Sequence, residues 1–273
     1  PDGESLAFDD EQARLSILDL DTRKVRVVDS AAFSGDDIYA SVNWSTDSKY
    51  LAVARADSRE GRAQIVVLAR DGSRKAVLSS DRYESASAVF SRDGKWLYFL
   101  SDREFVATPR APWGDRNMGP GFDRRTRIYA LALQAGNRFP FQPADELSKD
   151  DKAAGKDKDD DGKSDKNGDR KETKQPALAA IDWDGLAGRL FEVPAAAGNF
   201  RALAIDDKRL YFIDEGSGAE ARPQLKTLAI GNDGDEAKTF AEEISSYQLS
   251  ADGKKLLLVK WSEHGAGAMF VVD

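Results

Sequence analysis

Short apolar runs recur along the chain, and each follows a turn that is led by an aspartate. Four copies align without gaps, and a fifth is weaker: residues 1–8, 46–53, 92–99, 251–258 and, less clearly, 206–212. In each copy, residues that tolerate a positive backbone φ precede apolar and aromatic residues that favour strands. The pattern predicts a hairpin turn that leads into a buried strand.

The spacing of these copies indicates a β-propeller. The leading residues Asp2, Asp47, Asp93, Asp206 and Asp252 lie 45, 46, 113 and 46 residues apart. A period near 45 residues, with short strands and no helical periodicity, is typical of four-stranded propeller blades. We therefore predict an all-β fold, a partial β-propeller of about four and a half blades that belongs to a propeller of seven or six blades.

Each predicted blade has an inner strand that runs into the turn. Inner strands are expected at residues 38–44, 85–90, 200–205 and 246–249. The strands that follow the turns are expected at residues 15–20, 25–29, 64–69, 75–78, 127–133, 225–230, 237–241 and 268–272. The first blade should lack its inner strand and the last blade its fourth strand, because the chain starts at a turn and stops after a third strand.

The long third step implies about 67 extra residues in the third blade, in two loops. One loop is expected from about 104 to 125 and the other from about 140 to 188. Within the second, residues 149–175 hold nine Lys/Arg and nine Asp/Glu and no large apolar residue, so they cannot bury enough surface to offset the entropy of ordering. We predict one domain, 1–273, with an insertion at 140–188 that is disordered at 149–175.

Composition excludes several classes of function. The chain has 40 Lys+Arg and 48 Asp+Glu, a net charge of −8, which argues against a nucleic-acid-binding surface. No run approaches the ~20 apolar residues that span a bilayer, so no membrane partner is expected. Cysteine is absent and His264 is the single histidine, which excludes disulfides, cysteine nucleophiles and multi-histidine metal centres. We expect no cofactor.

The patterns that could carry catalysis or bind a metal are weak. Residues 157–165 match the opening of a calcium loop, but the twelfth position is Gly168 instead of the bidentate glutamate. His264 lies in a Gly-containing turn without a nucleophile elbow, which favours an exposed or capping role. Paired carboxylates at 36–37, 206–207 and 242–243 lie in turns, where acidic residues are ordinarily solvated; a glycosidase pair is the less favoured alternative.

The loop around Trp113 differs from these patterns. It is rich in aromatic residues, glycine, proline and arginine, and such a loop on a rigid scaffold is a common place for binding. The alternative is that Trp113, Phe105 and Phe122 cap the hydrophobic end of a blade. The sequence supports the two interpretations about equally.

The aspartate-led turns that enter apolar strands resemble those of Tol-system and prolyl-oligopeptidase-type propellers. A more specific pattern is the order Ser101-Asp102-Arg103, Pro112-Trp113-Gly114-Asp115-Arg116-Asn117-Met118-Gly119-Pro120, Phe122-Asp123-Arg124-Arg125-Thr126, Pro140-Phe141-Gln142-Pro143 and Ile181-Asp182-Trp183-Asp184-Gly185-Leu186. These motifs resemble the propeller region of bacterial tricorn-like serine proteases. The resemblance covers the whole chain and is most specific from 101 to 198. It departs at Gly121, where an aromatic residue is expected.

The resemblance implies a role in peptide degradation. In that family two propellers precede a PDZ-like module and a serine-peptidase core, and none of the family's catalytic residues maps onto this chain. The propeller is then expected to frame or filter the passage of peptides to a core outside this chain. The substrate-path candidates are Arg103, Trp113, Arg116 and Arg124; no catalytic, cofactor-binding or metal-binding residue is expected.

A non-catalytic, protein-binding propeller of the Tol-system type is the rival interpretation. The expected partners are peptides and other domains of the same parent chain, and a homo-oligomer is left open. A cytoplasmic location is expected, with the periplasm as the alternative. Because the chain has no initiator methionine and opens at a turn, we also expect it to be part of a longer protein.

Overall fold

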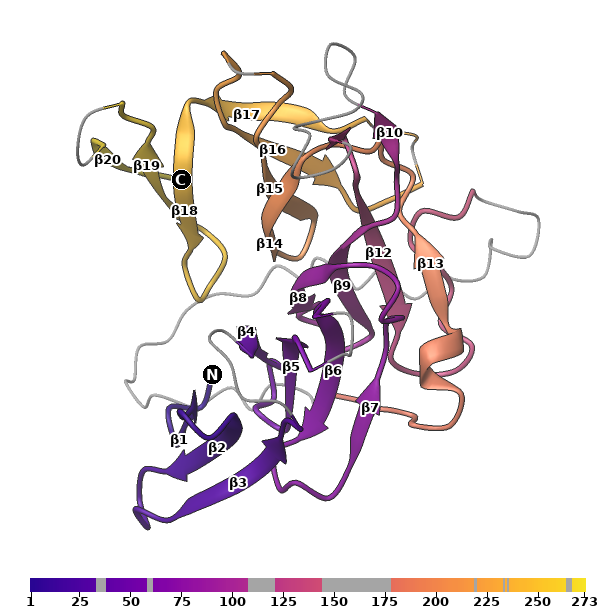
Figure 1. Ribbon diagram of the computed structural model, residues 1–273, viewed down its shortest axis with the longest axis vertical. Helices are drawn as coiled ribbons and strands as arrows, with labels where there is room; N and C mark the ends of the chain where they lie inside the picture. The colour runs from indigo at the N-terminus through magenta and orange to yellow at the C-terminus, as the bar shows by residue number, and fades with distance from the viewer. Residues whose placement is uncertain are drawn as a thin grey trace, which may run out of the picture.

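Antiparallel sheets form nearly all of the regular structure in the computed structural model, which describes residues 1–32, 38–57, 61–107, 121–143, 178–218, 220–232, 234, 236–263 and 267–273. Within these residues there are six sheets. Five of them follow one another around an arc, from the sheet that contains β1 to the sheet that contains β20 (Figure 1). The expected all-β fold, a partial propeller, is confirmed.

In the first three sheets of the arc, every strand pairs with its neighbour along the chain from the inner edge outward. The first holds β1 (Ser5–Asp9), β2 (Arg14–Asp19) and β3 (Val25–Ser30). The second holds β4 (Tyr39–Trp44), β5 (Tyr50–Arg55), β6 (Gln64–Ala69) and β7 (Lys75–Val77). The third holds β8 (Ser85–Phe90), β9 (Trp96–Asp102), β12 (Thr126–Ala132) and β13 (Leu190–Glu192).

The remaining sheets repeat this order, apart from one hairpin. The fourth sheet holds β14 (Phe200–Ile205), β15 (Arg209–Asp214), β16 (Gln224–Ala229) and β17 (Lys238–Glu242). The fifth holds β18 (Ile244–Leu249), β19 (Leu256–Lys260) and β20 (Met269–Val272). A two-stranded hairpin of β10 (Val106–Ala107) and β11 (Phe122–Asp123) extends from the third sheet between β9 and β12.

A repeated hydrogen-bond network explains why aspartate leads the turns. In the third sheet, Ser91 Oγ donates to Asp93 Oδ1 (2.6 Å), which also accepts from the backbone N–H of Lys95 (3.0 Å). Ser91 Oγ in turn accepts from the backbone N–H of Trp96 (2.9 Å). The same three bonds recur in two other turns, around Ser45 and Asp47 and around Ser250 and Asp252. The side chains thus satisfy backbone donors that the tight turn leaves unpaired.

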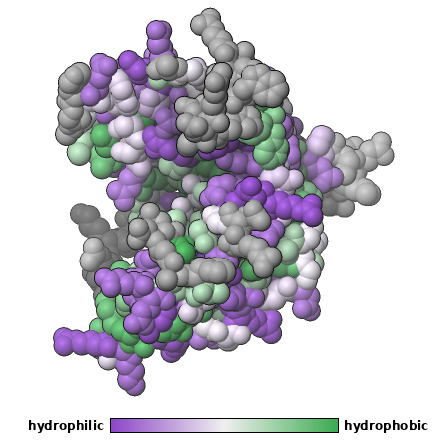
Figure 2. All heavy atoms as spheres, viewed as in Figure 1, coloured by the Kyte–Doolittle hydropathy of each residue, from purple (hydrophilic) through white to green (hydrophobic). Residues whose placement is uncertain are grey.

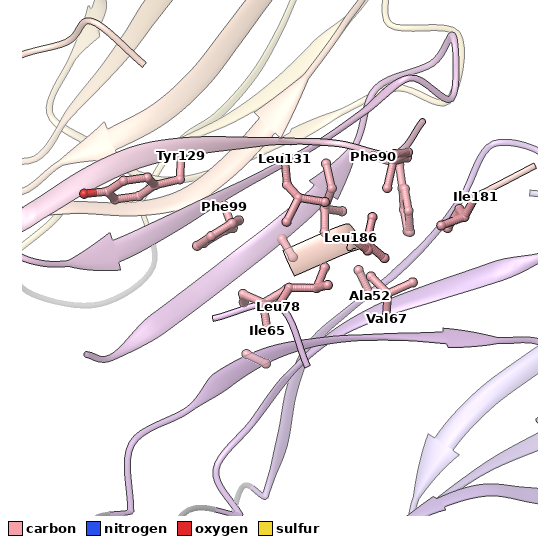
Figure 3. Close-up of a cluster of buried hydrophobic side chains, with 14 of the residues drawn as sticks. Ala52, Ile65, Val67, Leu78, Phe90, Phe99, Tyr129, Leu131, Ile181 and Leu186 are labelled. Carbon is pink, nitrogen blue, oxygen red and sulfur yellow. The ribbon is translucent and has the colours of Figure 1, made fainter. Parts of the chain in front are cut away.

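The central strands are apolar without interruption because both of their faces are buried. In β9, Leu97 and Phe99 pack toward the second sheet, whereas Trp96, Tyr98 and Leu100 pack toward the fourth. The cluster between the second and third sheets joins side chains of β5, β6, β9 and β12 (Figure 3). Similar clusters separate the other neighbouring sheets of the arc. The core is therefore a series of layers between sheets.

The described ends of the predicted 140–188 insertion belong to this core. Phe141, Ile181 and Leu186 are buried, and Leu186 begins a short 3-10 helix, η2 (Leu186–Gly188), that packs against β7 and β12. The backbone N–H of Asp182 donates to Leu133 O (2.9 Å). The chain therefore returns to the third sheet before β13 pairs with β12. The bounds of the insertion stay a prediction, and residues 149–175 lie outside the described part of the chain.

The loop expected at 104–125 is partly regular structure, which corrects the sequence interpretation. The backbone N–H groups of Arg103 and Glu104 both donate to Arg125 O (2.9 and 3.0 Å), so the β9–β12 ladder continues into β10 and β11. Phe105 and Phe122 pack edge to face across this hairpin, with their ring centroids 5.5 Å apart. The two arms therefore hold each other at the base of the loop.

Hydrophobic side chains are exposed on the two sheets at the ends of the arc. They include Leu6, Val25 and Val27 of the first sheet and Met269 and Val271 of the fifth. In the space-filling view, hydrophobic surface gathers over the first sheet, and a notch separates the two ends of the arc (Figure 2). These faces resemble the buried faces of the inner sheets but have no sheet packed against them within the described residues.

Candidate functional site

The inner strands β4, β8 and β14 share an irregularity at the same position. Each shifts register against its neighbour within a bulge. The first residue of each bulge has a positive φ: Ser41 (54°), Ser87 (54°) and Ala202 (53°). A positive φ is disfavoured for a residue with a side chain, and a bulge bends its strand and redirects side chains. Three neighbouring inner strands therefore carry the same local bend.

The central cavity is a space of about 1420 Å3 at the ends of the inner strands of four sheets. Its walls include Asn43 of β4, Val89 of β8, Leu203 of β14 and Gln248 of β18. The aspartate-led turns of the third and fifth sheets form part of its rim. Each of these wall strands is paired within a sheet, so the packing of the sheets positions this part of the wall. Connecting segments, including Gln134 and Leu178, complete the lining.

Hydrogen bonds between sheets hold the walls of the central cavity together. Asn43 Oδ1 accepts from the backbone N–H of Phe90 across the gap between the second and third sheets (3.4 Å). The Tyr247 hydroxyl of β18 lies within hydrogen-bond distance of the carbonyl oxygens of Ala202 (2.5 Å) and Tyr211 (2.8 Å) in the fourth sheet. Burial raises the pKa of Tyr247, so its hydroxyl stays protonated and able to donate.

A smaller cavity of about 510 Å3 lies between the third and fourth sheets, at the opposite ends of β8 and β14. Charged pairs line it: Arg125 Nε lies 2.9 Å from Asp102 Oδ2, and Arg201 pairs with Glu215. The Thr126 hydroxyl also donates to Asp102 (2.7 Å). This end of the inner strands is therefore polar and charged, whereas the charged residues of the central cavity lie in the turns at its rim and not on its wall strands.

Glu84 is the titratable group of the smaller cavity with a raised pKa. Burial is the main cause, and the charge of Asp102 adds to it, whereas the backbone N–H of Ala63 donates to Glu84 (3.1 Å) and acts in the opposite direction. Ionisation of Glu84 is therefore less favourable than that of an exposed glutamate. Proton uptake at this carboxylate is favoured by its surroundings.

Arg103, a substrate-path candidate, is held between aromatic rings. Its guanidinium carbon lies 4.0 Å from the ring centroid of Tyr129 and 5.3 Å from that of Tyr83. Its Nε also donates to Ser101 Oγ (3.2 Å). A cation over two rings is attracted to their negative faces. The main role of Arg103 is therefore structural, because it links Tyr83 and Tyr129 at the base of the hairpin.

Arg124 lies at the base of the same hairpin, but its side chain is 67% exposed. The backbone N–H of Arg124 donates to Asn199 Oδ1 (2.9 Å), and Asn199 Nδ2 donates to Asp123 Oδ1 (2.7 Å). The hydrogen bond from Asn199 is the largest cause that lowers the pKa of Asp123, and a bond from Ser217 adds to it. Asn199 and Ser217 tie the hairpin of the third sheet to the fourth sheet. The backbone of Arg124 is thus fixed, and its exposed head group makes only long contacts through Nε among the described residues, with Ser217 Oγ (3.4 Å) and Asp123 Oδ2 (3.9 Å).

The structure thus brings Arg103 and Arg124 to one end of the inner strands, away from the aspartate-led turns. Trp113 and Arg116, the other two candidates, lie outside the described residues, as do His264 and the calcium-like segment 157–165. The sequence interpretation missed Asn199 and Tyr247. No local pattern marks either residue, because their partners lie in other strands that are distant along the chain.

The chain matches the family model of the tricorn protease second beta propeller domain over residues 1–264. This range includes the first four sheets, β18 and β19 of the fifth sheet, the central cavity and the hairpin. The chain belongs to this family. Membership confirms the tricorn part of the expected resemblance.

Relatives of this tricorn propeller domain support the assignment. A tricorn protease homolog from Saccharolobus solfataricus is 22% identical over 95% of this chain and 21% of the relative. The crystal structure of the tricorn protease has a TM-score of 0.66 at 15% identity and covers 94% of this chain and 23% of that chain. The chain therefore spans about a fifth of the length of these proteins. The sequence relative is archaeal, so the expected bacterial origin stays a prediction.

Tol-type propellers share the fold of this tricorn propeller domain. The structure of TolB from Acinetobacter baumannii has a TM-score of 0.51 at 16% identity and covers 99% of this chain and 49% of that chain. Among the residues that the structure describes, no cluster of three or more His, Asp or Glu side chains is arranged to hold a metal. In the same residues, no helix is long and apolar enough to cross a bilayer.

Proposed function

We propose that this tricorn-type propeller domain frames and filters the passage of peptides to a serine-peptidase core outside this chain. The central cavity carries the proposal, because the inner strands of four sheets line it and its volume is about 1420 Å3. The membership in the tricorn family connects such a cavity with peptidases. The domain itself performs no bond cleavage in this account.

The composition of the cavity wall supports passage in preference to tight binding. Its wall combines apolar side chains such as Val89 and Leu203 with polar ones such as Asn43 and Gln248. The charged side chains that line the cavity, such as Arg92 and Asp207, lie in the turns at its rim. Along the wall strands, the backbone of a peptide would therefore find polar groups without a strong charge to hold it. Rigid walls of hydrogen-bonded strands discriminate by width, so the domain would select peptides by size and not by side-chain chemistry.

Narrowing the cavity tests the proposal. The variant Gln248→Trp should fill the cavity, because Gln248 lies on its wall and its side chain is exposed there. In the full-length peptidase, we expect this variant to hydrolyse peptides of about ten residues several-fold more slowly and a minimal chromogenic substrate at an unchanged rate. The matched control is Thr239→Trp on the outermost strand β17. Equal slowing of both substrates, or of neither, would contradict the proposed path.

A protein-binding surface is the second candidate, and the hairpin favours it. Phe105 (59% exposed), Val106 (57%) and Phe122 (42%) form an apolar patch at its base. Exposed apolar groups that cluster on a fixed element are typical of contacts with another protein or another domain. A Phe105→Ser variant that loses a contact with a neighbouring domain, or loses self-association in light scattering, while peptide selection is unchanged would favour this function. The cellular location of the protein, cytoplasmic or periplasmic, stays a prediction.

A further inference from the structure

Arg92 connects two sheets that are not neighbours. It follows β8 in the turn of the third sheet, and its Nη1 and Nη2 donate to the carbonyl oxygens of Asp252 (2.8 Å) and Ala251 (2.7 Å) in the turn of the fifth sheet. All three residues border the central cavity, as does Asp207 in the turn of the fourth sheet. The side chain of Arg92 therefore reaches across the rim of the cavity from the third sheet to the fifth and bypasses the turn of the fourth sheet.

The fifth sheet is shaped to receive this side chain. Gly253 has a φ of +69°, and a Cβ there would lie 2.7 Å from Arg92 Nη2 and 2.9 Å from its Cζ. A side chain at Gly253 would therefore displace the guanidinium, apart from the backbone strain that a positive φ imposes. Glycine at this position permits both the turn and the close approach of Arg92.

The backbone of Arg92 is held more firmly than its guanidinium. Ser91 and Asp93, on either side of Arg92, belong to the hydrogen-bond network of the turn. At Gly94, a Cβ would lie 3.0 Å from Leu178, so this turn is packed from behind by the returning chain. The backbone of Arg92 is thus fixed, while its guanidinium is bound, among the residues that the structure describes, only by two exposed carbonyl groups.

These contacts of Arg92 are better suited to obstructing the entrance of the cavity than to stabilising the packing of the sheets. A guanidinium that binds two exposed carbonyl oxygens exchanges them for water at little cost, so the contact contributes little to holding the sheets together. Its position across the rim nevertheless limits what can enter the cavity beside it. The opening would widen whenever the side chain rotates away.

We propose that Arg92 is a crossbar over the rim of the central cavity and determines the width of the molecule that enters from the side of the aspartate-led turns. The identity of that molecule as an extended peptide rests on the proposed function. A single extended chain would pass or displace the side chain, whereas a hairpin or a folded segment would be excluded.

Thiol labelling tests the crossbar without any peptidase activity. The 273-residue chain contains no cysteine, so a single Gln248→Cys substitution places one reactive thiol on the cavity wall. Its rate of modification is measured with a small reagent, iodoacetamide, and a bulky one, a polyethylene-glycol maleimide. Adding Arg92→Ala should raise the rate with the bulky reagent several-fold and change the rate with iodoacetamide little. Lys24→Cys, exposed in the first sheet, is the control thiol and should show no dependence on Arg92 with either reagent.

Gly253→Ala provides an independent variant, because it displaces the guanidinium while Arg92 itself is retained. It should reproduce the effect of Arg92→Ala, and circular dichroism identifies any variant that loses its fold. If both variants fold and neither raises the rate at which the bulky reagent modifies the thiol, the proposed role of Arg92 is wrong. If both raise this rate but the length preference of the full-length peptidase is unchanged, the crossbar stands and the proposed peptide path is wrong.

Discussion

The two ends of the inner strands are built by different means. At the end with the aspartate-led turns, the same Ser-Asp network recurs in the second, third and fifth sheets. At the hairpin end, contacts such as Asn199–Asp123 and Arg103–Tyr129 occur once and join residues far apart along the chain. The repeat therefore builds the scaffold, whereas the contacts that occur outside the repeat come from a hairpin inserted in one blade.

A substitution in the buried core that both ends share should have the largest effect on stability. Phe99 is fully buried between the second and third sheets, so Phe99→Ala should lower the free energy of unfolding by about 3–5 kcal/mol. The matched variant at the hairpin end, Phe105→Ala, removes a side chain that is 59% exposed and should cost less than about 1 kcal/mol. Urea titration of both variants measures the difference, and equal losses would show that the hairpin belongs to the core.

The repeated turn should give an intermediate effect that depends on burial. Ser91→Ala removes the acceptor of the buried Trp96 N–H and should lower the free energy of unfolding by about 1–3 kcal/mol. Ser250→Ala removes the same acceptor in an exposed turn, where water replaces it, so the loss should be below about 1 kcal/mol. If the two variants lose equal free energy of unfolding in urea titration, the hydrogen bond of the turn contributes the same amount whether or not it is buried.

The hairpin end should respond locally before it responds globally. Arg103→Met removes the cation between Tyr83 and Tyr129 and should lower the free energy of unfolding by only about 0.5–2 kcal/mol. Hydrogen exchange should nevertheless become faster in β10 and β11, because this contact fixes the base of the hairpin. Arg103→Lys is the control that retains the charge. An unchanged rate of hydrogen exchange in β10 and β11 of the Met variant would show that Arg103 does not stabilise the hairpin.

Proton binding should give the smallest effect, with opposite signs at the two ends. Hydrogen bonds from Ser250 and from the Lys254 N–H lower the pKa of Asp252 below 3.8, so its contribution to stability is present above pH 3.8 and is lost as the pH falls through the lowered pKa. Burial raises the pKa of Glu84 above 4.5, so its ionisation destabilises the fold as the pH rises through that raised value. Carboxyl 13C NMR should show Glu84 titrating at a higher pH than Asp252, and the reverse order would contradict both assignments.

Much of the scaffold could be predicted from the sequence because its signals are local. The strands expected at 64–69, 85–90 and 200–205 coincide with β6, β8 and β14, where an apolar run lies between turn residues. Strand β9 is buried on both faces, which explains its continuous run from Trp96 to Leu100. The four-and-a-half-blade arrangement followed from the period alone.

The site could be predicted only in part. Arg103 and Arg124 were singled out by resemblance, yet the sequence gives no sign that Arg103 lies between two rings or that Asn199 holds Asp123. The crossbar was also hidden, because the rest of the third sheet, the whole fourth sheet and strand β18 separate Arg92 from Gly253 along the chain. Such contacts depend on how successive sheets pack, and no spacing along the chain records it.

Photo-cross-linking can locate the proposed path of a peptide through the domain. A peptide of about ten residues with a benzophenone side chain is bound to the full-length protein and irradiated, and the attached residues are identified by mass spectrometry. We expect attachment to the wall of the central cavity, at Val89, Leu203 or Gln248. Attachment confined to the exposed faces of the two sheets at the ends of the arc, with none in the cavity, would contradict it.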